Sequence, residues 1–241
     1  VCPLHREVPD RIAAMALLQS SVAIDVFVLG CAIALPVLVG VGMWGEVGSK
    51  FPAKLWFPWH PFLMTLAFPA LMTMGRWSYV TAIDFSLSIR RQLHRGLMLL
   101  AVIAAIIGYV GIAKAHAPKA QFFGYNFIDH TWSVRTRVAH TWIGYLLLVA
   151  MLAQAIMGMA KLHVIGQGQR IFTFHGILGK VILVLTCVEM CLAIRFWEWS
   201  ASLKIPSYAL TIVLAIFGVL MPRQAVKADD EETPLVASAT A

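Results

Sequence analysis

Long apolar runs alternate with short polar stretches along most of the chain. A helix needs about 20 apolar residues to cross the hydrocarbon core of a bilayer, and six runs approach that length. Most tryptophans lie near the ends of these runs, as they do in the interfacial aromatic belts of membrane proteins. The runs predict six transmembrane spans, at Val22–Trp44, Trp59–Tyr79, Gly96–Ala113, Val138–Ala160, Phe174–Ile194 and Ile205–Met221.

The composition favours an all-α integral membrane protein. The chain is 60% hydrophobic and 13% charged, whereas a soluble domain carries about 25% charged residues. We therefore expect one domain over residues 1–223, with six transmembrane helices and a four-helix core formed by spans two to five. Residues 224–241 are polar, and we expect them to form a disordered tail.

The net charge of +7 bears on orientation in the membrane. Its basic residues lie in short loops between the spans, and none of them forms a basic face with interleaved aromatic residues, so nucleic acid is not an expected partner. With six spans, both termini lie on one face, here called Y, and the opposite face is called X. Y carries slightly more basic residues, which predicts that Y is cytoplasmic or matrix-side.

Four of the eight histidines stand at the beginning of consecutive spans, and they are the main candidate site residues. Because successive spans run in opposite directions, His60 and His140 should lie toward X, and His94 and His175 toward Y. Polar and ionisable side chains inside a membrane are costly and usually functional. The sequence thus predicts two histidine pairs, one near each face.

Two facing imidazoles suit the axial positions of a haem iron. Zinc needs a third or fourth protein ligand, and neither pair has a carboxylate or cysteine beside it in the sequence. Gly144 and Gly179 each follow a histidine at i+4, and Gly96 lies two residues after another, which leaves room for a flat macrocycle. Close helix packing explains such glycines equally well. We expect two b-type haems stacked along the membrane normal.

Other polar residues are weaker candidates. His116 and His130 lie in the X-side loop 116–137, where an electron donor or acceptor could dock, although simple solvation of the loop is an alternative. This loop is rich in aromatic residues, and we expect it to pack over the helices.

Two acidic residues fall inside predicted spans. Asp25, in the first turn of span one, is expected to act as an interfacial cap. Glu189 approaches X, where it either lies near the His60–His140 pair or pairs with Arg195. The cysteines inside the spans are expected to be small buried apolar residues.

Five motifs in spans two to five resemble a known family. They are Trp59-His60-Pro61-Phe62-Leu63-Met64 with Phe68, Arg91-x-x-His94, His140-Thr141-Trp142-x-Gly144, Gln154-x-x-x-Gly158, and His175-x-x-x-Gly179 with Glu189. In this order they resemble the eukaryotic cytochrome b561 family of ascorbate-dependent transmembrane diheme oxidoreductases, and in particular its short single-domain members.

The resemblance implies that two haem b groups are held by His60 with His140 and by His94 with His175. It also implies electron transfer from cytoplasmic ascorbate on Y to monodehydroascorbate or a ferric chelate on X. The ascorbate site would include a basic residue three positions before the span-three histidine, which is Arg91 here. Further basic residues on Y could complete an anion-binding pocket, or could serve only to orient the protein in the membrane. These residues are Arg95, Lys161, Arg170 and Lys180. Lys180 could instead pair with a haem propionate.

The chain departs from the family at two places. Met74 stands where many members have glutamate, and the segment 133–139 before His140 is more basic than usual, with Arg135 and Arg137. These differences concern the donor and acceptor rather than the haem ligands.

Two other functions remain open from the sequence. One is a supernumerary subunit of a larger respiratory or other membrane complex, in which haem has a structural or minor redox role. The other is a four-histidine metal transporter without haem. Expected partners are the lipid bilayer, ascorbate or another small reductant, and a second copy or a larger complex.

Overall fold

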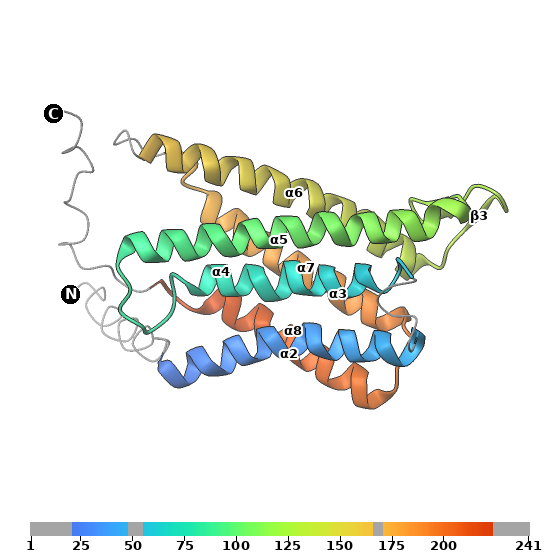
Figure 1. Ribbon diagram of the computed structural model, residues 1–241, viewed down its shortest axis with the longest axis horizontal. Coiled ribbons are helices and arrows are strands. Elements are labelled where there is room, and N and C mark those ends of the chain that lie inside the picture. Colours follow the sequence, from blue (N-terminus) through green and yellow to red (C-terminus); the bar gives the residue numbers. More distant parts are fainter. Residues whose placement is uncertain (1–20, 48–54, 166–170, 224–241) are drawn as a thin grey trace, which may run out of the picture.

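The computed structural model describes residues 21–47, 55–165 and 171–223 (Figure 1). The predicted tail over residues 224–241 and Arg170 lie outside this part of the chain. Five described helices are long and apolar enough to cross a membrane. They are α2 (Val22–Val47), α5 (Leu87–His116), α6 (Arg135–Ile165), α7 (His175–Phe196) and α8 (Ala201–Leu220).

The second predicted span is built from three consecutive helical segments. These are α3 (Trp59–Thr65), the π-helical η3 (Leu66–Met72) and α4 (Thr73–Trp77). Pro69 lies inside η3. A proline ring clashes with the carbonyl of the preceding helical turn and lacks an N–H group, and a wider π turn accommodates both effects. Together with the five long helices, this segmented helix confirms the predicted all-α integral membrane fold.

Helix α5 begins nine residues before the predicted start of span three at Gly96. The side chain of Ser86 accepts a hydrogen bond from the backbone N–H of Ile89 and caps the new first turn. The apolar run marked only the part of this helix that lies in hydrocarbon. Its polar N-terminal turns extend beyond that part because capping and helix propensity do not depend on the membrane.

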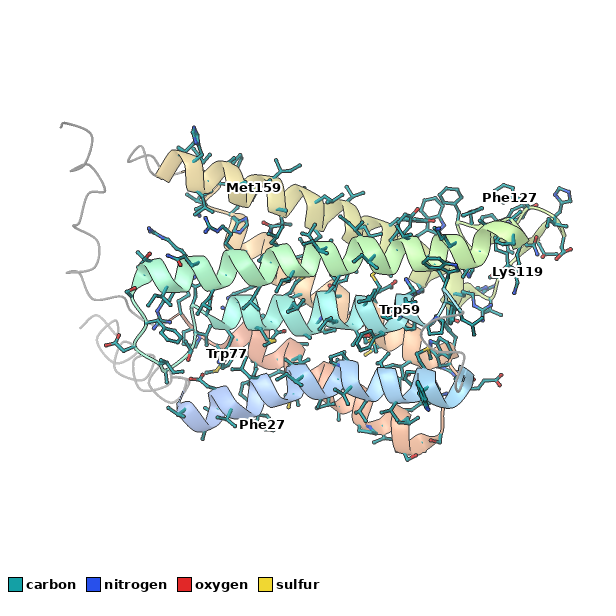
Figure 2. The ribbon with its side chains drawn as sticks, viewed as in Figure 1. Phe27, Trp59, Trp77, Lys119, Phe127 and Met159 are labelled. Atoms are coloured by element: carbon teal, nitrogen blue, oxygen red, sulfur yellow. The ribbon has the colours of Figure 1, made fainter. Side chains whose placement is uncertain are left out.

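The helices alternate in direction, and both ends of the described chain lie at the same end of the molecule (Figure 1). This end is Y, and the small strands lie at the opposite end, X. Helix α5 packs on α3 and η3, α6 packs on α7, and α2 packs on α8. Apolar side chains such as Phe27 and Met159 are exposed and point away from the bundle, as a lipid-facing surface requires (Figure 2).

A buried core joins α2, span two and α8. Its apolar members include Val28, Leu35 and Leu214, which are fully buried. Asp25 lies in the first turn of α2 as expected, but only 3% of it is exposed. Its carboxylate accepts hydrogen bonds from Trp77 Nε1 (2.7 Å), Thr81 Oγ1 (2.7 Å) and the backbone N–H of Ala82 (2.9 Å). Asp25 therefore connects α2 to the Y end of span two. This is a larger role than the interfacial cap that the sequence predicted.

The loop on X forms a small antiparallel sheet after the 3-10 turn η4 (Ala117–Lys119). Its strands are β1 (Gln121–Phe122), β2 (Tyr125–Asn126) and β3 (Thr131–Trp132), in the order β1-β2-β3. The Phe123 ring stacks on Trp142 of α6, with centroids 5.8 Å apart. Gly124 has a φ of +78°, and a Cβ there would lie 3.0 Å from Val138. The loop thus packs on the start of α6.

Candidate functional site

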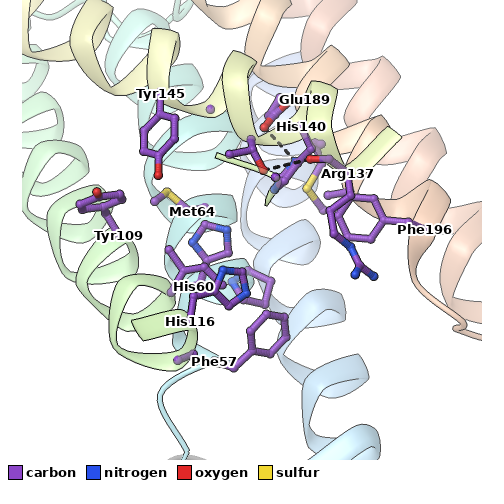
Figure 3. Close-up of a pocket in the computed structure, with 18 of the residues that line it drawn as sticks. Phe57, His60, Met64, Tyr109, His116, Arg137, His140, Tyr145, Glu189 and Phe196 are labelled. Atoms are coloured by element: carbon purple, nitrogen blue, oxygen red, sulfur yellow. Dashed lines mark hydrogen bonds and ion pairs between the residues drawn. The ribbon is translucent and has the colours of Figure 1, made fainter. Parts of the chain in front are cut away.

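His60 and His140 face each other near X. His60 lies in the first turn of α3 and His140 in the second turn of α6. Their ring centroids are 6.2 Å apart, and the ring planes cross at 88°. Both side chains line one cavity, which Figure 3 shows.

His94 and His175 face each other near Y. They come from the N-terminal parts of α5 and α7. Their ring centroids are 6.3 Å apart, and the planes cross at 80°. The bundle therefore contains two histidine pairs with nearly the same separation and nearly perpendicular rings, one toward each face.

Backbone carbonyls orient two of these rings in a reciprocal way. Nδ1 of His60, in span two, lies 3.2 Å from the carbonyl oxygen of Gly108 in α5. Nδ1 of His94, in α5, lies 2.9 Å from the carbonyl oxygen of Gly75 in span two. A carbonyl can only accept, so Nδ1 carries the proton in both rings and donates it. Nε2 is then the nitrogen with a free lone pair in each ring.

Glycines on α5 allow span two to approach this closely. A Cβ on Gly108 would lie 3.1 Å from Leu63 Cβ, and a Cβ on Gly111 would lie 3.0 Å from the carbonyl oxygen of Trp56. Neither glycine was singled out from the sequence. The signal was present, because small residues one helical turn apart in an apolar helix mark a close helix contact.

A carboxylate contacts the third ring. Oε1 of Glu189 on α7 lies 2.8 Å from Nδ1 of His140 (Figure 3), and both side chains are largely buried. Of the two sequence-based interpretations of Glu189, the structure therefore places it beside the His60–His140 pair. A Cβ on Gly144 would lie 3.1 Å from this oxygen. The space at Gly144 thus admits the carboxylate, where the sequence analysis expected room for a macrocycle.

The fourth ring has a different environment. Within the described residues, Nδ1 of His175 is buried and makes no hydrogen bond. Gln154 Nε2 donates to the backbone carbonyl of His175 across 3.0 Å. A Cβ on Gly158 would lie 3.6 Å from Cε1 of His175, whereas a Cβ on Gly179 would face Gln154 instead, at 3.8 Å. Gly158 is therefore the motif glycine that lies against this ring.

The cavity beside His60 and His140 has a volume of about 550 Å³. This is within the range of cofactor and small-molecule sites, about 300–1,000 Å³. Its wall is mainly apolar and comes from span two, α5, α6, α7 and the X loop. Tyr109 on α5 and Tyr145 on α6 lie on one side of it (Figure 3).

Cationic and imidazole side chains also line this cavity, at its X end. They are His116, Lys119 and Arg137. The Arg137 guanidinium lies 5.5 Å from the centroid of the Phe196 ring, which in turn lies 5.3 Å from that of His140. The sequence analysis singled out His116 as a candidate and noted Arg137 as a basic departure from the family, whereas Lys119 was not singled out.

His130 lies away from the cavity. It is in the loop between β2 and β3, where its Nδ1 is 3.5 Å from the hydroxyl of Tyr125. Of the two candidates on X, only His116 is among the cavity residues.

The candidate anion-binding residues on Y differ in exposure. Arg91, Lys161 and Lys180 are half-buried, and Arg95 is exposed. Lys161 is close enough to His175 to interact with it electrostatically.

Two further arginines contribute to the Y end, and neither is among the candidates named from the sequence. Arg223 interacts electrostatically with both Y-side histidines and lies 4.9 Å over the ring of Tyr79. The Tyr79 ring is 5.3 Å from that of His94. Arg76 donates to the carbonyls of Gly218 and Met221, so it also ties span two to α8. The density of positive charge near the Y pair suits an anionic ligand.

The geometry of both pairs fits an iron held between two imidazoles. With each metal–nitrogen bond about 2 Å long, the centroids of two opposed rings would be about 6 Å apart. The observed separations of 6.2 and 6.3 Å match this. Among the described residues there is no cluster of three or more His, Cys, Asp or Glu side chains that could hold a metal ion.

Comparison with known proteins confirms the family resemblance. The model of the eukaryotic cytochrome b561 family matches residues 59–201, more than half of the chain and all four facing histidines. A comparison with curated proteins gave no match. The chain belongs to the eukaryotic cytochrome b561 family, whose members are transmembrane oxidoreductases that bind haem b.

Proposed function

We propose that the protein transfers electrons from ascorbate on the Y face to an anionic acceptor, monodehydroascorbate or a ferric chelate, on the X face. In this proposal His60 with His140, and His94 with His175, are the axial ligands of two haem b groups. When bound, each haem would accept and release one electron at its iron. Y would be the cytoplasmic face, in keeping with its slight excess of basic residues.

The four histidines would act by holding both axial positions in fixed orientations. Carbonyl acceptors at Gly108 and Gly75 set the tautomer of two rings, and Glu189 contacts a third. With two histidines holding each haem, no side chain of this site would be left to present a substrate to the iron, so substrates would exchange electrons with the bound haem from its surroundings. Selection of donor and acceptor then depends on the side chains around the two ends of the bundle.

On Y, positive charge would attract and orient the ascorbate anion. Arg91 stands one turn before His94, and its planar fork suits a bidentate contact with an anionic oxygen pair. Lys161, Lys180 and Arg223 add positive charge around the same histidine pair. Arg95 and Arg170 are outer candidates for the same site.

On X, the three residues at the cavity end would receive the acceptor. Lys119 and Arg137 present positive charge, and His116 presents an imidazole, toward a space that leads to His60 and His140. An anionic acceptor complements this charge. His130 would have at most a peripheral role in docking.

The single observation that carries the proposal is the presence of two facing histidine pairs of nearly equal geometry at opposite ends of one bundle. It is tested with oriented proteoliposomes that contain the purified protein, ascorbate on one side and ferricyanide on the other. Ascorbate on the Y side should reduce the haem absorption bands rapidly and should drive loss of ferricyanide across the membrane.

Arg91→Ala should raise the apparent KM for ascorbate roughly tenfold while both haems remain bound. Arg135→Ala, an exposed arginine on X, is the matched control and should leave this KM unchanged. If ascorbate reduces the bound haem from neither side of the membrane, the proposal is contradicted. That result would favour a structural subunit of a larger complex.

A further inference from the structure

We infer that Glu189 is a positioning residue that holds Nδ1 of His140 and gives the X-side haem a lower reduction potential than the Y-side haem. The inference rests on the proposed function, because it assumes that His60 and His140 are axial ligands. It concerns the only contact between an axial histidine candidate and a carboxylate that the described residues show.

The contact is short and enclosed. Oε1 of Glu189 lies 2.8 Å from Nδ1 of His140, and the Glu189 side chain is 11% exposed. Both carboxylate oxygens and Nδ1 of His140 are buried, and among the described residues none of the three has a partner with hydrogen-bond geometry, so the 2.8 Å approach is a close polar contact without that alignment. The carboxylate is therefore not shared with a cation that would neutralise it, and His140 is its available donor.

The packing of α6 on α7 maintains this contact. Gly144 follows His140 by one helical turn, and a Cβ there would lie 3.1 Å from Oε1 of Glu189. Glu189 therefore reaches the ring through a space that exists only because residue 144 has no side chain.

Among the described residues, the other three histidines have no carboxylate at Nδ1. Nδ1 of His60 and Nδ1 of His94 each face a neutral backbone carbonyl oxygen, at 3.2 and 2.9 Å respectively. Nδ1 of His175 has no hydrogen-bond partner within the described residues. The two histidine pairs, so similar in ring geometry, thus differ in one buried carboxylate.

The direction of the effect follows from charge. If Nε2 of His140 binds iron, Nδ1 must carry the proton, and Oε1 of Glu189 lies 2.8 Å away as an acceptor for it once the ring is aligned. A charged acceptor polarises this N–H bond more than a carbonyl does, which makes the ring more basic. A more basic ligand stabilises the ferric state over the ferrous state and lowers the potential. Positive charge lies near both pairs, with Lys161 and Arg223 near His175 and with Lys119 and Arg137 on the cavity beside His140, so the difference in potential is assigned to Glu189 alone.

The test is a spectroelectrochemical titration of the full-length protein with both haems bound, comparing wild type with Glu189→Gln. The amide keeps the shape of the side chain and removes its negative charge. The lower of the two midpoint potentials should rise, and the other should stay unchanged. The His94→Leu variant, which keeps only the X-side histidine pair, assigns the shifted transition to X.

Three further variants complete the design. Glu189→Asp keeps the charge and should restore most of the wild-type potential. Gly144→Ala displaces the carboxylate and should shift the same midpoint upward by less than Glu189→Gln does. Glu198→Gln neutralises an exposed acid just beyond the end of α7 and should change neither potential.

The inference is overturned if Glu189→Gln leaves both midpoints unchanged, shifts both equally or moves only the Y-side haem. If Glu189→Gln fails to retain the X-side haem, the other two variants decide. Gly144→Ala should then raise the X-side midpoint alone, and Glu189→Asp should keep it near the wild-type value; a Gly144→Ala variant with unchanged midpoints overturns the inference. A wild-type protein that binds no haem would contradict the proposed function itself, a result distinct from two bound haems that do not respond to Glu189.

Discussion

Nδ1 of His60 donates to the carbonyl oxygen of Gly108 across 3.2 Å, so α5 fixes a ring that belongs to span two. The converse contact, from His94 of α5 to the carbonyl of Gly75, fixes the other ring across 2.9 Å. Each helix therefore orients the histidine of its neighbour, and the spacing between the two helices controls both rings.

Gly111→Ala should disturb the X-side pair. The added Cβ would lie 3.0 Å from the carbonyl oxygen of Trp56 and 3.6 Å from the backbone N of His60, and backbone atoms cannot move aside cheaply. We expect a loss of about 1–3 kcal/mol in stability, as for other overpacked sites, and weaker binding of one haem. Thermal unfolding and haem absorbance measure the two effects.

Gly30→Ala, in α2, is the control. A Cβ at this position would meet no atom within 4 Å. Alanine favours a helix over glycine by about 0.8–1.0 kcal/mol, so this variant should be at least as stable as wild type. Equal behaviour of the two variants would show that close packing at Gly111 does not position His60.

Asp25→Ala should be strongly destabilising. It removes the acceptor for Trp77 Nε1, Thr81 Oγ1 and the Ala82 N–H group, and leaves these donors buried. An unsatisfied buried donor costs about 1–3 kcal/mol, so we expect a loss of roughly 3 kcal/mol, measured as a lower Tm in detergent. Glu46→Ala, which removes an exposed carboxylate at the other end of α2, should leave Tm nearly unchanged. A similar Tm for both variants would contradict the role assigned to Asp25.

Leucine substitutions of the histidines should separate into two groups. His60→Leu and His140→Leu should each remove the same haem, and His94→Leu and His175→Leu should each remove the other. A double variant within one pair should lose no more haem than either single variant, whereas a double variant across the pairs should lose both. Haem loss that groups His60 with His175 would contradict the pairing seen in the structure.

Arg137→Gln should slow electron delivery to anionic acceptors. Its guanidinium lies over Phe196 at the X end of the cavity, and its charge should raise the local concentration of an anion. We expect the oxidation rate with ferricyanide to fall roughly tenfold at low ionic strength, and the difference to shrink in salt. Arg135→Gln, whose side chain is not among the cavity residues, is the control. An equal loss of rate with a neutral acceptor would contradict an electrostatic role.

The sequence was sufficient to predict what depends on periodicity and direction. Apolar length predicted the spans, and alternating span direction sorted the four histidines toward two faces. Helix ends that extend beyond the hydrocarbon, such as the start of α5 at Leu87, were missed because hydropathy does not report on them. The π-helical segment around Pro69 was missed as well, since a buried proline can also end or kink a helix.

The contacts around the rings required coordinates. The carbonyls of Gly75 and Gly108 carry no side-chain signal, and which of them faces a histidine depends on helix rotation. Glu189 had two plausible partners, and only packing of α6 on α7 places it at His140. The basic character of Arg137 was visible in the sequence, but only the cavity shows that it lies with Lys119 and His116.

The central claim is that each facing histidine pair holds one haem b. The most direct measurement is the haem-to-protein ratio of the purified chain, from the pyridine haemochrome spectrum and quantitative amino-acid analysis. The account predicts two haem b per polypeptide, both low-spin. A ratio of one would mean that one pair is not a haem site, and a ratio of zero would contradict the account altogether.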